Sequence, residues 1–438
     1  MGMSKIENSF FWIKCSSRSR GPTNSCSTMV GTVGSLSSNV FVILLLLGGG
    51  LIGLGLLVML VTGRFLGRLI LDPTIDPPAT LDVNGDTGIS AGVKDELASI
   101  NMVIGASFGG VPSMTATSGP GLALMTEAMG LAVAAEVPAV IVNVMRGGPS
   151  TGIPTKSEQV DLNIALHGLH GDAPHLVLGA LDHADCVLVT EWSVRLAEAL
   201  QTVAIVLTDQ NLAQSRALIP QPDYALPDIP ARRVPDDGAN YARYALTDDG
   251  VSPMAIPGQS GAAYVADGLE HTETGKPSAA AADHAAQLDK RRRKIEDFDY
   301  GDLWADIRGS GPLAILTWGS TSTAVREAAD RLREAGVELR VIAMRLLLPA
   351  RPEQLAAALR GVERVLVVEQ SHGAQFWRYL RSYYDIDADL HSLARPGPLV
   401  ITPGDRDAIL MAVACAQIFG TPASHDVVRG GVACELVH

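Results

Sequence analysis

The sequence has few cysteines, and they lie far apart. The five residues are Cys15, Cys26, Cys186, Cys415 and Cys434, and no two of them form a C-x-x-C pair. Iron–sulfur clusters and structural zinc ions are usually held by closely spaced cysteines, so this chain alone is not expected to hold either. A low and scattered cysteine content also indicates a reducing compartment.

Positive charge and phosphate-binding loops are scarce as well. A net charge of -13 and a pI near 5.2 create a field that repels polyphosphates, which argues against a general role in nucleic-acid binding. The glycine-rich runs are not P-loops, because no Gly-Lys-Ser or Gly-Lys-Thr follows at the required spacing. We interpret the one basic cluster, Lys290 to Lys294, as the solvated face of a helix in a linker. The alternative is a docking patch for an acidic partner.

Hydrophobic residues, by contrast, are abundant and make up 47% of the 438 residues. This length and composition are enough for two or three globular domains. From about Val83 onward, apolar strands alternate with amphipathic helices and with turns rich in Gly and Pro. This pattern predicts an α/β fold with a mostly parallel sheet. We expect a first domain over 81–217, an extended linker with one helix over 218–309, and a second, smaller α/β domain over 310–422.

The predicted elements can be placed by periodicity. Helices are expected over 95–106 and 121–136 in the first domain, and around Ala324 to Leu332 in the second. Strands are expected over 113–117, 139–144, 313–317, 338–343 and 364–369, and a further helix and strand are expected to end near Thr208.

The N-terminal region, residues 1–80, is atypical of such a fold. Residues 40–63 contain no charged side chain over 24 positions. A helix of that length reaches about 36 Å, which is enough to cross a hydrocarbon layer of roughly 30 Å. The segment does not fit a cleaved signal peptide, because the stretch before it is long and no small-residue cleavage site follows. A transmembrane helix, a buried apolar helix and a segment foreign to the fold remain open interpretations.

Polar residues suited to an anionic ligand follow two neighbouring predicted strands. The run Met114 to Gly121 reads MTATSGPG, and the run from Asn143 to Leu162 reads NVMRGGPSTGIPTKSEQVDL. Ligands of open α/β folds bind at the carboxyl ends of the strands, where both runs arrive. Arg146 can pair with a carboxylate through two parallel hydrogen bonds, and the hydroxyls of Ser150, Thr151 and Thr155 can donate to its oxygens. The alternative is that the glycines only shape a surface loop.

These same runs carry a specific resemblance. The strings KDELASINMVIGASFGG, TATSGPGLALMTEAMGLA and AEVPAVIVNVMRGGPSTGIPTKSEQVDL resemble the pyrimidine-binding domain of the alpha subunit of 2-oxoacid:ferredoxin oxidoreductases, of the 2-oxoglutarate type. LAILTWGSTSTAVREA and VLVVEQSHGAQ resemble the transketolase-C-like second domain of the same subunits. The resemblance covers roughly residues 90–420.

The resemblance implies an enzyme subunit for the oxidative decarboxylation of a 2-oxoacid, such as 2-oxoglutarate to succinyl-CoA, with coenzyme A as acceptor and ferredoxin as electron carrier. It implies thiamine diphosphate shared with a beta subunit, which would hold Mg and the iron–sulfur cluster, sometimes a separate gamma subunit, and a cytoplasmic location. By the same resemblance Glu96 and Thr117 contact the cofactor, with Glu96 at the aminopyrimidine ring as the catalytic carboxylate. Arg146 and Thr155 would hold the 2-oxoacid, with Ser150 and Thr151 beside them.

The sequence departs from the family at its start. A strand with a Tyr-Pro-Ile-Thr-Pro-like motif normally opens the first domain, and no such motif is found here, so we expect the sheet to lack that strand. This leaves a second hypothesis, a non-catalytic, membrane-attached assembly subunit with a degenerate first strand. A transketolase-like synthase is disfavoured, because no Gly-Asp-Gly with a downstream Asn is present.

One cluster of histidines invites a metal interpretation. His167, His170, Asp172 and His175 follow one another closely, and two histidines three positions apart can share a helix face. We favour the alternative, a helix end whose histidines are hydrogen-bonded.

Overall fold

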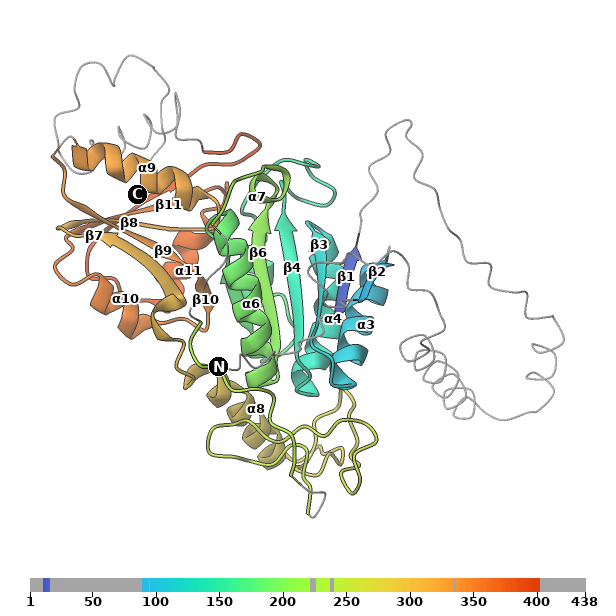
Figure 1. The fold of residues 1–438 in the computed structure, drawn as a ribbon. Coiled ribbons are helices and arrows are strands. Elements are labelled where there is room, and N and C mark those ends of the chain that lie inside the picture. Colours follow the sequence, from blue (N-terminus) through green and yellow to red (C-terminus); the bar gives the residue numbers. More distant parts are fainter. Residues whose placement is uncertain are drawn as a thin grey trace, which may run out of the picture. The chain divides into compact units, whose positions relative to one another are not determined.

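The computed structural model describes residues 11–15, 89–93, 95–220, 226–236, 240–334 and 336–401. These residues form two sheets with helices packed on them (Figure 1). The fold is α/β with mostly parallel strands, as the sequence predicts.

The first sheet has seven strands, of which all but one run parallel to their neighbours. At its centre, β4 (Ala139–Met145) and β6 (Val203–Asp209) are mostly apolar, because helices cover both faces of the sheet. β6 is buried at every position. In spatial order the strands are β10 (Leu346–Leu348), β5 (Leu176–Gly179), β6 (Val203–Asp209), β4 (Ala139–Met145), β3 (Ser113–Ser118), β1 (Phe11–Cys15) and β2 (Ile89–Val93).

Aspartates begin three of the helices that follow these strands. Asp95, Asp182 and Asp209 each accept a backbone N–H of the first turn, which satisfies a donor that the helix itself leaves unpaired. The helices of this part are α3 (Glu96–Phe108), α4 (Gly121–Ala134), α5 (Leu162–His167), α6 (His183–Leu200) and α7 (Gln210–Gln214).

The second sheet has five strands, with only β7 antiparallel to its neighbour. In spatial order they are β12 (Asp389–Ala394), β11 (Arg364–Glu369), β8 (Leu313–Trp318), β9 (Leu339–Met344) and β7 (Ala305–Gly309). Later in the chain the helices are α8 (Ala281–Glu296), the 3-10 helix η1 (Gly301–Trp304), α9 (Thr321–Glu334), α10 (Pro352–Ala358) and α11 (Gln375–Tyr383).

The two sheets are joined by a strand that the chain contributes to the first sheet after passing through the second. After β9 the chain returns to the first sheet, where β10 pairs antiparallel with β5. Beside this strand Arg345 Nε donates to Asp185 Oδ1 over 2.7 Å. One hydrophobic cluster runs through both sheets and includes Trp192 and Trp318, which are fully buried. The second sheet is therefore held against the first by a strand, an ion pair and a shared core.

The sequence located half of the strands that the structure describes. The predicted strands appear as β3, β4, β6, β8, β9 and β11, and those predicted with both bounds lie within two residues of them. β1, β2, β5, β7, β10 and β12 were not predicted. β10 is only three residues long, and β7 and β12 carry polar or exposed residues.

The expectation of a missing first strand is wrong for the described backbone. Phe11–Cys15 forms β1, which pairs in parallel with β3 on one side and β2 on the other. This strand lies in the extreme N-terminal region. The family motif is absent there, and no pattern in the sequence predicted a strand.

The apolar run over 40–63 lies outside the described residues. Among the residues that the structure does describe, none of the helices is long and apolar enough to span a bilayer.

The interpretation of the basic cluster as a solvated face is also wrong for its two lysines. The side chains of Lys290 and Lys294 are 0% and 2% exposed, and both ammonium groups contact Glu136, at 2.6 and 2.7 Å. The pattern of the sequence could not reveal this, since the carboxylate lies 154 positions away in the chain. Arg292, by contrast, is 59% exposed.

Electrostatics explains why Glu136 can be buried. Burial alone would raise the pKa of this carboxyl, but the charges of Lys294 and Lys290 outweigh burial and hold its pKa well below its usual range. Burial in turn lowers the pKa of Lys294 to about 8. The ion triad joins α8 to the end of α4, so the charges stabilise the packing only while all three are present.

Glu136→Gln is expected to destabilise the chain by about 3 kcal/mol, because it leaves two buried ammonium groups without a counter-charge. The midpoint of urea unfolding, followed by tryptophan fluorescence, measures the loss. Glu191→Gln is the matched control, since Glu191 pairs with Arg195 at an exposed surface and should change stability by less than about 0.5 kcal/mol. Equal midpoints for the two variants would contradict this assignment.

Candidate active site

Glu96 and Thr117 converge on the turn that starts α4. Glu96 is the first residue of α3, and Thr117 lies near the carboxyl end of β3. A Cβ atom placed on Gly121 would lie 2.0 Å from Thr117 Oγ1 and 2.7 Å from Glu96 Oε1. Both polar atoms therefore meet at a position that only glycine leaves open.

Arg146 lies against the same turn from the neighbouring strand. It directly follows β4, is 9% exposed, and packs on Gly119, where a Cβ would lie 2.7 Å from its Nε. Gly119 also has a φ of +60°, a conformation that favours glycine. The structure thus brings Glu96, Thr117 and Arg146 together around one turn, residues 117–121.

Thr155 lies beside Arg146 at the base of the loop that follows β4. Gly147 N donates to Lys156 O over 3.2 Å. Gly147 follows Arg146 and Lys156 follows Thr155, so the backbone at the two ends of the loop is close together. The φ of Thr155 is +62°, which is rare for a β-branched residue and costs roughly 1–3 kcal/mol. Strained backbone of this kind clusters at active sites and ligand-binding loops, which fits a binding role for this loop.

Ser150 and Thr151 lie at the tip of this loop, and both are exposed. Gly152 next to them has a φ of +55° and could not carry a side chain, because a Cβ would meet Gly147 O at 1.7 Å. The loop is therefore tightly folded on itself, with its hydroxyls arranged as a rim outside the buried Arg146.

Asp161 is a charged residue of the site that the sequence did not reveal. It accepts a hydrogen bond from Asn143 Nδ2 over 2.9 Å and directly precedes α5. Burial raises the pKa of Asp161 to about 6, against the opposing effects of the Asn143 hydrogen bond and the Arg146 charge. The nearby charge of Glu158 acts in the same direction as burial. No spacing rule would have singled out this aspartate, because its partners lie on other elements.

The polar atoms around the turn fit a bound heterocycle and a bound anion. Thr117 Oγ1 and Arg146 Nε are buried, and neither has a hydrogen-bond partner in the described part of the chain. Buried polar atoms of this kind usually receive a partner, which here a ligand would supply. A ring nitrogen could hydrogen-bond to Glu96 and Thr117 beside the turn, and a carboxylate could pair with Arg146, so the residues present fit the cofactor that the sequence suggested.

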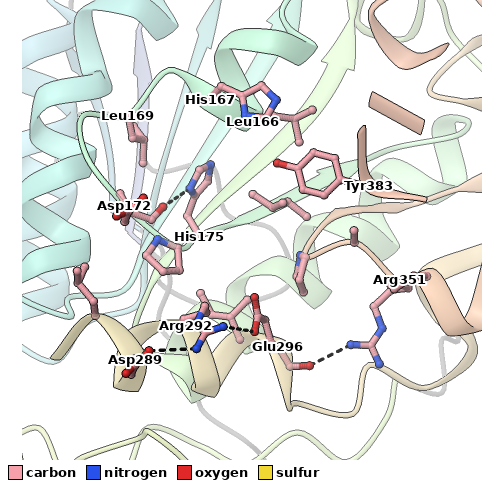
Figure 2. Close-up of a pocket in the computed structure, with 18 of the residues that line it drawn as sticks. Leu166, His167, Leu169, Asp172, His175, Asp289, Arg292, Glu296, Arg351 and Tyr383 are labelled. Atoms are coloured by element: carbon pink, nitrogen blue, oxygen red, sulfur yellow. Dashed lines mark hydrogen bonds and ion pairs between the residues drawn. The ribbon is translucent and has the colours of Figure 1, made fainter. Parts of the chain in front are cut away.

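A cavity of about 990 Å³ lies elsewhere, at the amino end of β5 (Figure 2). Arg292 and Arg351 line it, but so do the four carboxylates of Asp172, Asp289, Glu296 and Glu353. Arg292 is already paired with Asp289 at 3.0 Å and with Glu296 at 3.6 Å. Because acids outnumber arginines, this cavity does not suit a small carboxylate.

Of the histidines near α5, His175 is hydrogen-bonded, whereas His167 and His170 are exposed. His175 is buried and bonds through its two ring nitrogens to the carbonyls of Ala173 and Ala165, both at 2.7 Å. Burial lowers the pKa of His175, although the hydrogen bonds to the two carbonyls act in the opposite direction. Over the described residues, no group of three or more His, Cys, Asp or Glu side chains is placed to hold a metal ion.

Two family descriptions match the chain. Residues 82–290 match the family described as pyruvate flavodoxin/ferredoxin oxidoreductase, thiamine diphosphate-binding. Residues 305–416 match the family described as the transketolase C-terminal domain. The two matches cover both sheets except β1, which lies in the N-terminal region outside them.

Curated relatives and a solved structure agree with these descriptions. The 2-oxoglutarate synthase subunit KorA of Methanothermobacter marburgensis is 33% identical over 68% of this chain and 80% of its own length. Subunit alpha of 2-oxoacid:ferredoxin oxidoreductase 2 of Aeropyrum pernix is 38% identical over 68% of this chain and 47% of its own length. The structure of 2-oxoglutarate:ferredoxin oxidoreductase from Magnetococcus marinus, with 2-oxoglutarate, coenzyme A and succinyl-CoA bound, has a TM-score of 0.70 and 32% identity.

These comparisons differ in coverage. The match to the Magnetococcus marinus structure includes 94% of this chain and 62% of the other. The chain spans about half the length of several curated relatives, including the one from Aeropyrum pernix, at 47%.

Asp161→Asn is expected to stabilise the chain at pH 7.5 and to leave its stability unchanged at pH 4. The pKa of Asp161 is raised from 3.8 to about 6 in the folded state, so folding becomes less favourable as the pH rises through this window. The full effect is at most about 3 kcal/mol, and partial solvent access reduces it. Urea unfolding at both pH values measures it, with the exposed Asp172→Asn as control. A gain of the same size at pH 4 would refute the assignment.

Proposed function

Because this chain belongs to the family of 2-oxoacid:ferredoxin oxidoreductase alpha subunits, we propose that it forms one half of a thiamine diphosphate active site. The proposed reaction is the CoA-dependent oxidative decarboxylation of a 2-oxoacid, with ferredoxin as the electron acceptor. The observation that carries the proposal is the convergence of Glu96, Thr117 and Arg146 on the turn at residues 117–121.

Glu96 is proposed as the catalytic carboxylate. Thiamine diphosphate, when bound, supplies the carbanion chemistry that releases CO₂ from the 2-oxoacid. Glu96 would share a proton between its Oε1 and the nitrogen of the pyrimidine ring, and the hydroxyl of Thr117 would hold the same ring. The neighbouring Gly121 supports this role, because the lack of a Cβ lets the side chains of Glu96 and Thr117 both approach the turn.

Arg146 is proposed to bind the carboxylate of the 2-oxoacid. A guanidinium can form two parallel hydrogen bonds to a carboxylate, and burial strengthens them. Thr155 would donate from the base of the loop, and Ser150 and Thr151 from its rim. We propose 2-oxoglutarate as the substrate, since its second carboxylate can use these hydroxyls and since several relatives are named for it.

The other half of the site is proposed to come from a beta subunit. Leu97 and Leu124 are 50% and 53% exposed, and they follow Glu96 and Gly121 closely in the chain. Large apolar side chains exposed beside a half-built site indicate a surface that a partner covers. We propose that the partner holds the diphosphate, Mg and the iron–sulfur cluster, that a gamma subunit is separate where present, and that the complex works in the cytoplasm.

Glu96→Gln is expected to lower kcat of the chain, assembled with its beta subunit, by at least about 100-fold, the usual contribution of one positioned acid–base group. The assay is CoA-dependent reduction of ferredoxin or of an artificial acceptor with 2-oxoglutarate. Glu127→Gln serves as control, because Glu127 is exposed on α4 and should leave the rate unchanged. An unchanged rate in Glu96→Gln would remove this residue from the mechanism.

Arg146→Lys is expected to raise KM for the 2-oxoacid at least about tenfold, because lysine keeps the charge but loses one of the two parallel hydrogen bonds. Arg146→Met should lower kcat/KM further, by about 100-fold, since charge-assisted hydrogen bonds contribute roughly 1.5–3 kcal/mol. Lys156→Met, which removes an exposed cation from the same loop, is the control. Pyruvate measured beside 2-oxoglutarate tests the choice of substrate, and a preference for pyruvate would contradict it.

A further inference from the structure

The loop that carries Arg146 and Thr155 is held at its far end by the second sheet. Gln159 is fully buried there. Its Nε2 donates to Trp318 O over 2.8 Å, and its Oε1 accepts from Gln370 N over 2.7 Å. Its own backbone N donates to Gln370 O over 2.7 Å. One side chain thus satisfies backbone groups at the carboxyl ends of both β8 and β11.

Glu158, the residue before Gln159, makes a further contact with the same sheet. Glu158 Oε1 accepts from Gly397 N, just after β12, over 3.1 Å. Its other carboxylate oxygen lies against Gly147, where a Cβ would be 2.9 Å away. A continuous set of contacts therefore leads from the second sheet through Gln159 and Glu158 to Gly147, the residue next to Arg146.

The contact is too tight for other side chains. Gly319, with a φ of +63°, faces the amide of Gln159, where a Cβ would lie 2.5 Å from Nε2. Glutamine alone has the length together with the donor and the acceptor that Trp318 and Gln370 require. Losing the side-chain bonds would leave a buried N–H and C=O unpaired, so the pairing strongly fixes where the loop begins and ends.

We propose that Gln159 is a positioning residue through which the second sheet sets the location of Arg146 and Thr155 in the substrate site. The inference deepens the proposed function and rests on it. Gln159 does not touch the substrate. Its effect passes through Glu158, Gly147 and the Gly147–Lys156 hydrogen bond that keeps Thr155 beside Arg146.

Gln159→Met tests the proposal, because methionine has a similar volume and makes neither hydrogen bond. In the assembled enzyme, KM for 2-oxoglutarate should rise about tenfold with a smaller change in kcat, since binding in the ground state and in the transition state weakens equally. Backbone hydrogen exchange of residues 147–156 should also become faster, because the amides of Gly147, Ile153 and Lys156 bond within the loop.

Gln287→Met is the matched control. Gln287 is also buried and its Nε2 donates to Tyr244 O over 3.0 Å, but it lies on α8, away from the loop. It should lose stability without a change in KM or in exchange of residues 147–156. The proposal is overturned if Gln159→Met keeps the KM and the exchange of the wild-type enzyme, or if Gln287→Met reproduces both changes. A wild-type enzyme without 2-oxoacid turnover would instead refute the proposed function, while the exchange experiment would still decide the role of Gln159.

Discussion

The site depends on the close approach of side chains to the backbone at Gly119 and Gly121. Arg146 reaches across one glycine, and Glu96 and Thr117 reach across the other, to distances that any Cβ would block. One helix and two strands, α3, β3 and β4, can therefore bring a carboxylate, a hydroxyl and a guanidinium into one small volume. The parallel sheet supplies the geometry, because β3 and β4 are neighbours and end at the same edge (Figure 1).

The two ends of the first sheet carry different polar groups. At the carboxyl edge, Thr117 Oγ1 and Arg146 Nε are buried and have no hydrogen-bond partner in the described residues. At the other end, Glu136 is paired with both Lys290 and Lys294. Paired buried charges stabilise a fold only while every partner is present, whereas an unpaired buried group costs stability unless a ligand or another partner satisfies it.

How far the sequence could predict this structure follows from the range of each interaction. The strands and the residues Glu96 and Arg146 were found because their signals are local runs of residues or a resemblance carried by such runs. The burial of Lys290 and Lys294, the pairing of β10 with β5, and the contact of Gln159 with Gln370 all join positions far apart in the chain. A single sequence contains both partners of each pair but nothing that matches one to the other. Lys290 and Lys294 are four positions apart and so share a helix face, but this spacing does not say what that face contacts.

The predicted boundary between the two domains, near residue 310, is not a suitable place to divide the chain because of β10. Leu346–Leu348 lies beyond that boundary but completes the first sheet beside β5. A fragment ending at residue 309 would expose the backbone of Leu176–Gly179 as an open, fully apolar edge, which is prone to pair with other chains. Recombination that separated the two halves would therefore have to carry this strand along to keep the first sheet closed.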